Sequence, residues 1–202
     1  MKDYNRETRL AGFDRTHNLI LSWTYELPMG KGKRFLGGAS GALNHLVGGW
    51  QITAIQSYQS GAPIGVGGGT NIPLFGAGNR PNRLPGSSGR TSVSPGEFDP
   101  ALHRYLDINS FSQPDAFTFG NAAPNYADIR TFTFVNEDFS ILKDFRVREG
   151  HLFQFRAEFF NLFNRVVFGG IATNINAPAT FGTVSGQENV PRNIQFGLKY
   201  IF

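Results

Sequence analysis

The strongest constraint on this chain is a two-residue alternation of apolar and polar side chains that recurs in several separate segments. The clear cases cover residues 17–27, 50–59, 152–161 and 193–202. A period of two is that of a β-strand, whose successive side chains point to opposite faces. These segments therefore predict strands long enough for a tilted crossing of a bilayer, which takes about 9–11 residues, whereas most strands of globular proteins have about 5 or 6.

The segment FQFRAEFFNLFN, residues 153–164, shows the alternation most sharply, because one face is aromatic and the other is charged. A membrane span must satisfy its backbone hydrogen bonds internally, and a closed barrel does so between strands. Alternate side chains then face lipid and a lumen that tolerates charge when it is wet. We expect the lumen-facing residues to be Glu26, Gln154, Arg156, Glu158 and Lys199, and the lipid-facing residues to be Leu19, Leu21, Trp23, Tyr25, Trp50, Ile52, Tyr58, Phe153, Phe155 and Phe159.

A fifth, less regular segment at 130–143 predicts another strand, followed by a short turn over 144–151. The best helical candidate is the short stretch 40–47, and the rest is rich in Gly, Pro, Asn and Ser. The predicted fold is all-β: an antiparallel transmembrane β-barrel segment of about five strands with long loops on one side. Its expected parts are an extracellular loop at 1–16, a β-hairpin at 17–60 with a periplasmic linker at 28–49, an extracellular loop at 61–128, a β-hairpin at 129–161, an extracellular loop at 162–192 and a C-terminal strand at 193–202.

The composition excludes several classes of site. The chain has no cysteine, so it has no disulfide framework, thiolate metal site or cysteine nucleophile. Its net charge of +4 comes from scattered Lys and Arg residues, which argues against a nucleic-acid partner. It also has no apolar run long enough for a transmembrane helix.

Motifs that suggest chemistry are weak. GKGK at 30–33 lacks the spacing and the following helix of a phosphate-binding loop. GVGGGTN at 65–71 lacks the βαβ context of a dinucleotide site, so we expect a flexible loop over 65–71. The four histidines, His17, His45, His103 and His151, have no second ligand at metal-binding spacing. We therefore expect no catalytic residues, no cofactor and no metal, and hence no enzyme.

The terminal stretch NIQFGLKYIF resembles the C-terminal signature of bacterial outer-membrane proteins, with a final Phe preceded by apolar residues at alternate positions. In that class the last strand is recognised by the barrel-assembly machinery. The resemblance assigns this role to Phe196, Leu198, Tyr200 and Phe202.

Four further motifs are similar, in the same order, to the closing part of TonB-dependent outer-membrane receptors of the Oar-like, carboxypeptidase-regulatory-domain type. They are FDRTHNLILSWTYELPMGKGKRF (13–35), GGWQITAIQSYQSGAPIGV (48–66), NEDFSILKDFRV (136–147) and FQFRAEFFNLFN (153–164). The resemblance covers nearly the whole chain and thins out in the 67–128 loop.

That resemblance implies a 22-stranded barrel with a plug, a signal peptide and an N-terminal region that contacts the TonB complex. This chain would then be the C-terminal fragment of a receptor for uptake of a scarce solute, not functional alone, with outer-membrane lipid, the assembly machinery and an unknown solute as partners. Two alternatives stay open. One is a small outer-membrane barrel acting as an adhesin or pore, and the other is a secreted β-sandwich that binds carbohydrate through exposed aromatic residues.

Overall fold

A computed structural model describes residues 9–70 and 79–202 of the chain. These residues fold as two compact units. The sheet unit comprises residues 18–58, 135–166 and 189–202, and the loop unit comprises the chain up to His17 together with residues 59–134 and 167–188. Among the described residues, no helix combines the length and the hydropathy needed to cross a membrane.

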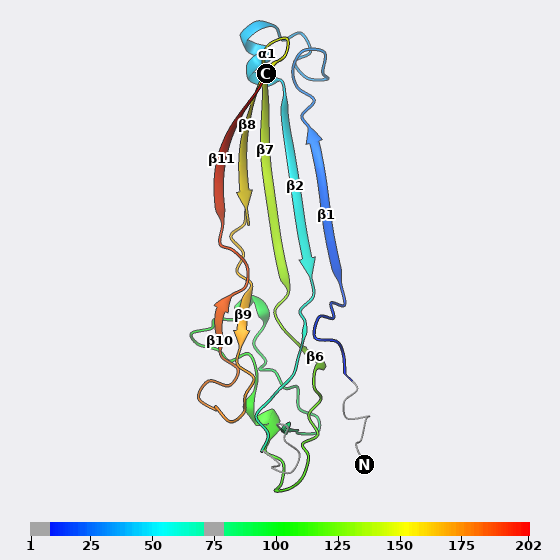
Figure 1. The fold of residues 1–202 in the computed structure, drawn as a ribbon, viewed down its shortest axis with the longest axis vertical. Coiled ribbons are helices and arrows are strands. Elements are labelled where there is room, and N and C mark those ends of the chain that lie inside the picture. The colour runs from blue at the N-terminus through cyan, green and yellow to red at the C-terminus, as the bar shows by residue number, and fades with distance from the viewer. Residues whose placement is uncertain (1–8, 71–78) are drawn as a thin grey trace. The chain divides into compact units, whose positions relative to one another are not determined.

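The sheet unit is built on five long strands in the order β1-β2-β7-β8-β11, which lie side by side in Figure 1. Their bounds are Asn18–Glu26 for β1, Trp50–Gln59 for β2, Phe134–Arg148 for β7, His151–Phe160 for β8 and Asn193–Ile201 for β11. The five strands predicted from alternation are therefore confirmed. Strands β1 and β11 lie at the two edges, so the described sheet is open.

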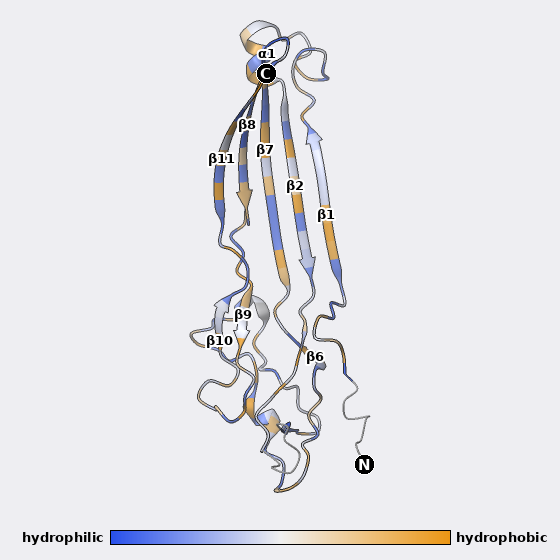
Figure 2. Cartoon of the chain, viewed as in Figure 1, coloured by the Kyte–Doolittle hydropathy of each residue, from blue (hydrophilic) through white to orange (hydrophobic). Residues whose placement is uncertain are grey.

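The strands alternate in hydropathy along their length, as the bands of β2, β7, β8 and β11 in Figure 2 show. Strand β8 pairs antiparallel with β7 on one side and with β11 on the other. Directly paired residues of an antiparallel sheet share a face, so the register decides which rows of side chains combine. Between β8 and β11 the pairing runs without a break from Asn193↔Phe160 to Ile201↔Leu152.

The turn predicted over 144–151 is wrong in its extent. Strand β7 continues to Arg148 and β8 starts at His151, which leaves a two-residue turn whose Gly150 has a φ of +77°. Phe145 and Val147 prolong the apolar row of β7, so the alternation carries the strand past the expected end. At its other end β7 begins at Phe134 rather than at residue 130.

The connection between β1 and β2, residues 27–49, contains the expected short helix, α1 (Gly41–Val47). Backbone hydrogen bonds fold the rest of it back on itself, with Phe35 N donating to Pro28 O and Gly30 N donating to Phe35 O. Lys31 N donates to Asn44 Oδ1, which ties the chain before the helix to the helix itself. This linker is therefore an ordered element at the end of the sheet where β1 ends and β2 begins (Figure 1).

The loop unit has a hydrophobic core of its own, which the loop composition did not predict. Its regular elements are short: β3 (Pro63–Ile64) pairs with β6 (Tyr126–Arg130), β4 (Asn82–Arg83) with β5 (Phe111–Ser112), and β9 (Phe168–Ile171) with β10 (Val184–Gln187). Two 3₁₀ turns, η3 (Pro95–Glu97) and η4 (Ile108–Ser110), complete it. The buried core residues are Ile64, Val66, Phe98, Tyr105, Leu106, Phe111, Ala122, Tyr126, Ile129 and Phe181.

Aromatic packing holds this core together. The ring of Phe98 lies 5.1 Å from Phe132 and 5.6 Å from Phe168, and Tyr105 lies 4.4 Å from Phe132, measured between ring centroids. Edge-on and tilted pairs at such distances add to the free energy of burial. The loops at 61–128 and 162–192 thus share one core, because Phe168 and Phe181 come from the second loop.

The glycine-rich stretch at 65–71 is part of this packing, and the expectation of a flexible loop is wrong for its described residues. Gly67 N donates to Thr173 O, and Ile175 N donates to Gly67 O. Ile64 and Val66, on either side of Gly65, are buried. Residue 71 lies outside the described residues.

Candidate functional surfaces of the sheet

One face of the sheet is aromatic, and the register explains how the strands build it. Leu198 pairs with Phe155, and Tyr200 with Phe153, so the apolar rows of β8 and β11 share a face. Phe145 of β7 pairs with Phe153 and extends that face to a third strand. The rings of Phe153 and Tyr200 stack with their centroids 4.6 Å apart.

Strands β1 and β2 continue the aromatic face. Trp23 Nε1 donates to Gln56 Oε1 over 3.2 Å, and the Trp23 ring meets Phe139 edge-on at 6.1 Å. Alternation then places the other predicted lipid-facing residues of β1 and β2 on this face: Leu19, Leu21, Tyr25, Trp50, Ile52 and Tyr58. All the residues expected to face lipid therefore share one face. That this face meets lipid stays a prediction at this point.

The aromatic face leaves much apolar surface uncovered. Phe196, Leu198 and Phe202 are 71%, 70% and 89% exposed. The fourth residue assigned to the assembly signal, Tyr200, is 45% exposed, so all four are accessible. A contiguous apolar surface of this kind marks contact with another apolar phase or a partner.

The opposite face is polar and carries the residues expected in the lumen. Lys199 pairs with Gln154, whose Nε2 donates to Asp144 Oδ1 over 3.0 Å. Arg156 and Glu158 form an ion pair at 3.3 Å, and Gln195 of β11 also donates to Glu158. The side chains of Gln154, Arg156 and Glu158 therefore each have a hydrogen-bond or ion-pair partner on this face.

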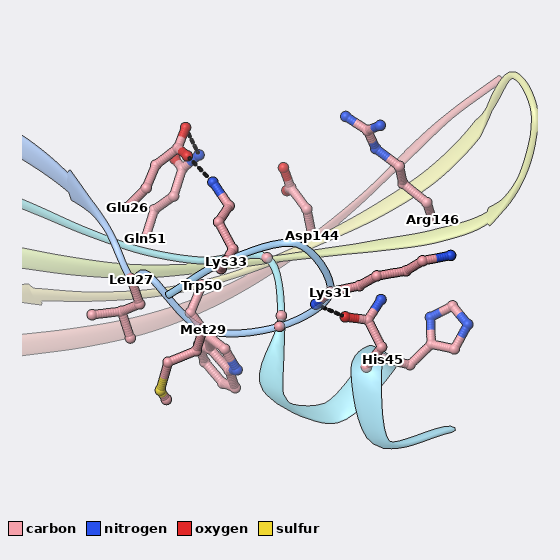
Figure 3. A pocket seen from close by; sticks show the side chains of 14 residues that line it. Glu26, Leu27, Met29, Lys31, Lys33, His45, Trp50, Gln51, Asp144 and Arg146 are labelled. Carbon is pink, nitrogen blue, oxygen red and sulfur yellow. Dashed lines mark hydrogen bonds and ion pairs between the residues drawn. The ribbon is translucent and has the colours of Figure 1, made fainter. Parts of the chain in front are cut away.

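Glu26 joins this polar face at the end of the sheet near α1. It accepts from Lys33 Nζ at 3.3 Å and from Gln51 Nε2 at 3.4 Å. These groups border a cavity of about 290 Å³ between the β1–β2 connection and the strands, which Asp144 and Arg146 also line. Figure 3 shows Glu26, Gln51 and Lys33 converging, while Lys31 and His45 extend away from them.

The cavity does not have the chemistry of a phosphate-binding loop. In GKGK, Gly30 N donates to Phe35 O, Gly32 N to Gly37 O and Lys33 N to Gly30 O. Lys31 N donates to Asn44 Oδ1. A phosphate loop needs such backbone N–H groups turned toward the ligand, and all four already have acceptors within the chain. Among the residues that the structure describes, no group of His, Asp and Glu could hold a metal ion.

Two ionic residues, Lys143 and Glu137, lie on the aromatic face and are not among the residues predicted from the sequence. Lys143 pairs with Phe155 and is 1% exposed; its Nζ donates to Gly48 O and lies 5.2 Å from the centroid of the Trp50 ring. Glu137 has the parity of Phe139 and is 2% exposed. The sequence could have predicted this position, because strict alternation along β7 places both residues in the apolar row.

Glu137 is held in a hydrogen-bonded network rather than left alone. Arg165 Nε donates to both of its carboxylate oxygens, at 3.1 Å and 2.8 Å, and the Tyr58 hydroxyl donates to Oε1 over 3.3 Å. Gln56 Nε2 in turn donates to the Tyr58 oxygen. A buried charge is tolerated when it is paired and hydrogen-bonded in this way.

The loop unit contains an ion pair, Arg83–Asp128, whose guanidinium lies against an aromatic ring. Arg83 donates to both carboxylate oxygens of Asp128, at 3.1 Å and 2.6 Å, and its guanidinium lies 4.7 Å from the centroid of the Tyr126 ring. The hydrogen bond from Arg83 lowers the pKa of the Asp128 carboxyl. Burial raises the pKa of the Tyr126 hydroxyl.

Phe117 is the most distinctive exposed residue of the loop unit. It is 83% exposed and has a φ of +61°, a conformation that costs a bulky residue free energy. Thr118 holds it there, because both the amide and the hydroxyl of Thr118 donate to Asp115 O. Asn79 Nδ2 donates to the Thr118 carbonyl. An exposed aromatic residue held in a costly conformation is a candidate contact for a ligand.

The model of one protein family, described as "Outer membrane beta barrel domain", matches residues 1–195. The chain belongs to this family. It is therefore a protein of the bacterial outer membrane, and its open five-stranded sheet is part of a β-barrel. Membership decides against the alternative of a secreted β-sandwich. No curated protein and no solved structure matches the chain significantly.

Membership in the outer membrane beta barrel domain family accounts for a sheet with one apolar face and one polar face. Such barrels carry an apolar outer band and, when wide, a polar, hydrated interior.

Proposed function

We propose that the chain forms the closing strands of the barrel of a TonB-dependent outer-membrane receptor that takes up a scarce solute. In this proposal the aromatic face meets lipid and the polar face lines a wet lumen. The strand β11, with Phe196, Leu198, Tyr200 and Phe202, carries the signal for the barrel-assembly machinery. The contact with the TonB complex is made by parts of the receptor outside this chain.

The charged polar face of the sheet carries the proposal. Arg156 and Glu158 lie on β8 and Lys199 lies on the neighbouring strand β11. The Arg156 and Glu158 side chains are 47% and 20% exposed, which suits a wide hydrated lumen. A barrel narrow enough to fill its interior with packed side chains would leave no room for such hydration. Charges of both signs suit a surface that meets a solute or a plug.

The open edges of the sheet support a barrel of more strands. Within residues 9–70 and 79–202, strands β1 and β11 each pair with a single strand. An unpaired strand edge in hydrocarbon leaves backbone N–H and C=O groups unsatisfied, at a cost of several kcal/mol each. Closure therefore takes further strands beyond the five of this sheet.

The loop unit supports a receptor in preference to a simple pore. The chain leaves β2 and β8, and enters β7 and β11, at the end of the sheet opposite to α1, so the β2–β7 and β8–β11 connections both start from that end. These loops share a buried aromatic core. A folded unit can present fixed contacts to a solute, and we single out the exposed Phe117 as one of them.

The test compares three strains of the native bacterium: wild type, a deletion of this gene and a deletion of TonB. Growth and radiolabelled uptake are measured over a panel of scarce solutes, such as iron chelates and oligosaccharides. We expect at least one solute whose uptake is lost in both deletion strains and in wild type treated with an uncoupler. Uptake that depends on this gene but not on TonB would instead support the passive pore.

A further inference from the structure

We propose that the β1–β2 connection, residues 27–49, is a membrane-interface element that binds anionic glycerophospholipid headgroups at the end of the barrel wall. The outer-membrane location comes from the family, and the lipid-facing direction of the aromatic face comes from the proposed function. The inference does not depend on TonB or on any solute.

The first observation is the charge of the connection. It contains Lys31, Lys33, Arg34 and His45, and it has no Asp or Glu in 23 residues. Lys33 is paired with Glu26, whereas Lys31 points away from that pair (Figure 3). The guanidinium of Arg34 lies 5.5 Å from the centroid of the Phe35 ring. Basic side chains beside a membrane attract anionic lipid, and each Lys or Arg adds to the attraction.

The second observation is a set of exposed apolar side chains in the same segment. Phe35 and Leu36 are 54% and 52% exposed, and Leu43 and Leu46 of α1 are 51% and 68% exposed. Leu43 and Leu46 are three residues apart and so lie on the same side of the helix. Basic residues interleaved with exposed apolar ones are the composition of an element that lies in the headgroup layer.

The third observation is the backbone of Leu36. It has a φ of +55°, in the left-handed region that a branched residue with a Cβ avoids. The hydrogen bonds of its neighbours fix this conformation, since Phe35 N donates to Pro28 O and Ala39 N donates to Leu36 O. The chain therefore keeps an apolar side chain outside at a position where glycine would be more stable, which points to a role in binding.

The connection is also hydrogen-bonded to residues of the aromatic face, the side that meets lipid in the proposed function. Trp50 Nε1 donates to Leu46 O over 2.9 Å, and Lys143 Nζ donates to Gly48 O. Both donors belong to the aromatic face, so the C-terminal end of α1 borders that face. Aromatic residues such as Trp form a girdle at the interface between hydrocarbon and headgroups at the two ends of such barrels.

The test uses the whole protein, purified from outer membranes in detergent and delipidated. Native mass spectrometry counts the lipids retained on titration with phosphatidylglycerol, with phosphatidylcholine and with lipid A. We expect wild type to retain phosphatidylglycerol preferentially. The double variant K31Q/R34Q should weaken this retention by roughly 10- to 30-fold at low salt.

Two further variants separate lipid binding from folding. R9Q/R15Q removes the same charge from two exposed arginines of the loop unit and should retain lipid as wild type does. L36G relieves the left-handed conformation, so it should fold at least as well as wild type while retaining less phosphatidylglycerol. Equal retention of the two phospholipids by wild type, preference for lipid A, or unchanged binding by K31Q/R34Q would each overturn the proposal.

Discussion

At the scale of single residues, Phe155 and Gln154 test which face of the sheet meets lipid. The proposed orientation makes Phe155→Arg costly by roughly 2–4 kcal/mol, the cost of arginine on the lipid face at mid-bilayer. Gln154→Arg should be tolerated, because Gln154 already donates to the Asp144 carboxylate, which can pair with an arginine. The measurement is the amount of heat-modifiable protein in the outer membrane. Equal amounts for the two variants would contradict the orientation.

A second prediction at this scale concerns the pair of Glu137 and Arg165. Arg165→Met should lower the free energy of unfolding by roughly 2 kcal/mol, because it leaves a buried carboxylate without its cation. The loss is below that of a fully buried pair because the Arg165 side chain is 47% exposed. Adding Glu137→Gln to Arg165→Met should recover part of the loss. A double-mutant cycle in urea measures this coupling, and additive effects would show that the two side chains act independently.

At the scale of elements, the C-terminal strand β11 carries a prediction about assembly. Phe202→Ser should lower the steady-state amount of the protein in the outer membrane several-fold, because the final aromatic residue belongs to the proposed assembly signal. Phe13→Ser is the matched control, since Phe13 is 85% exposed and Phe202 is 89% exposed. Immunoblots of membrane fractions measure both variants. Equal amounts would remove the role assigned to Phe202.

The long strands were predictable from sequence because each follows one physical rule. Alternation fixed β1, β2, β8 and β11 to within about two residues. The same rule, applied strictly, would have extended β7 to Arg148 and placed Lys143 in its apolar row. Alternation reports the face of a residue but is silent on what covers it, so the bond from Lys143 to the Gly48 carbonyl could not be inferred.

The core of the loop unit was beyond prediction for a different reason. Its contacts join residues far apart in the chain, such as Phe111 and Phe181, whose ring centroids lie 5.9 Å apart. No local period marks such residues, because β3, β4 and β5 have only two residues each. The abundance of Phe in Gly- and Pro-rich stretches was the available signal.

At the scale of the whole molecule, that core predicts that the loops unfold as a unit. Phe98 is 8% exposed and its ring contacts Tyr105, Phe132 and Phe168. Phe98→Ala should cost the loop unit about 3–5 kcal/mol, and Phe98→Leu should cost less. Hydrogen exchange should rise across 59–134 and 167–188 and stay unchanged in β8 and β11. Exchange that rises only near residue 98 would contradict a cooperative core.

The same unit should respond to acid through Asp128. The hydrogen bond from Arg83 lowers the pKa of Asp128 in the folded state, so the pair stabilises the unit above the unfolded pKa of about 3.9. That contribution is lost as the pH falls through the folded pKa. It should amount to at most about 1 kcal/mol, since the Asp128 side chain is 57% exposed. Asp128→Asn should remove this share of the acid dependence, measured as hydrogen exchange of β4 and β6 between pH 7 and pH 3. Asp115→Asn, in the same unit, serves as the charge-matched control. If Asp128→Asn keeps the acid dependence of wild type, other carboxylates govern the acid response of the loop unit.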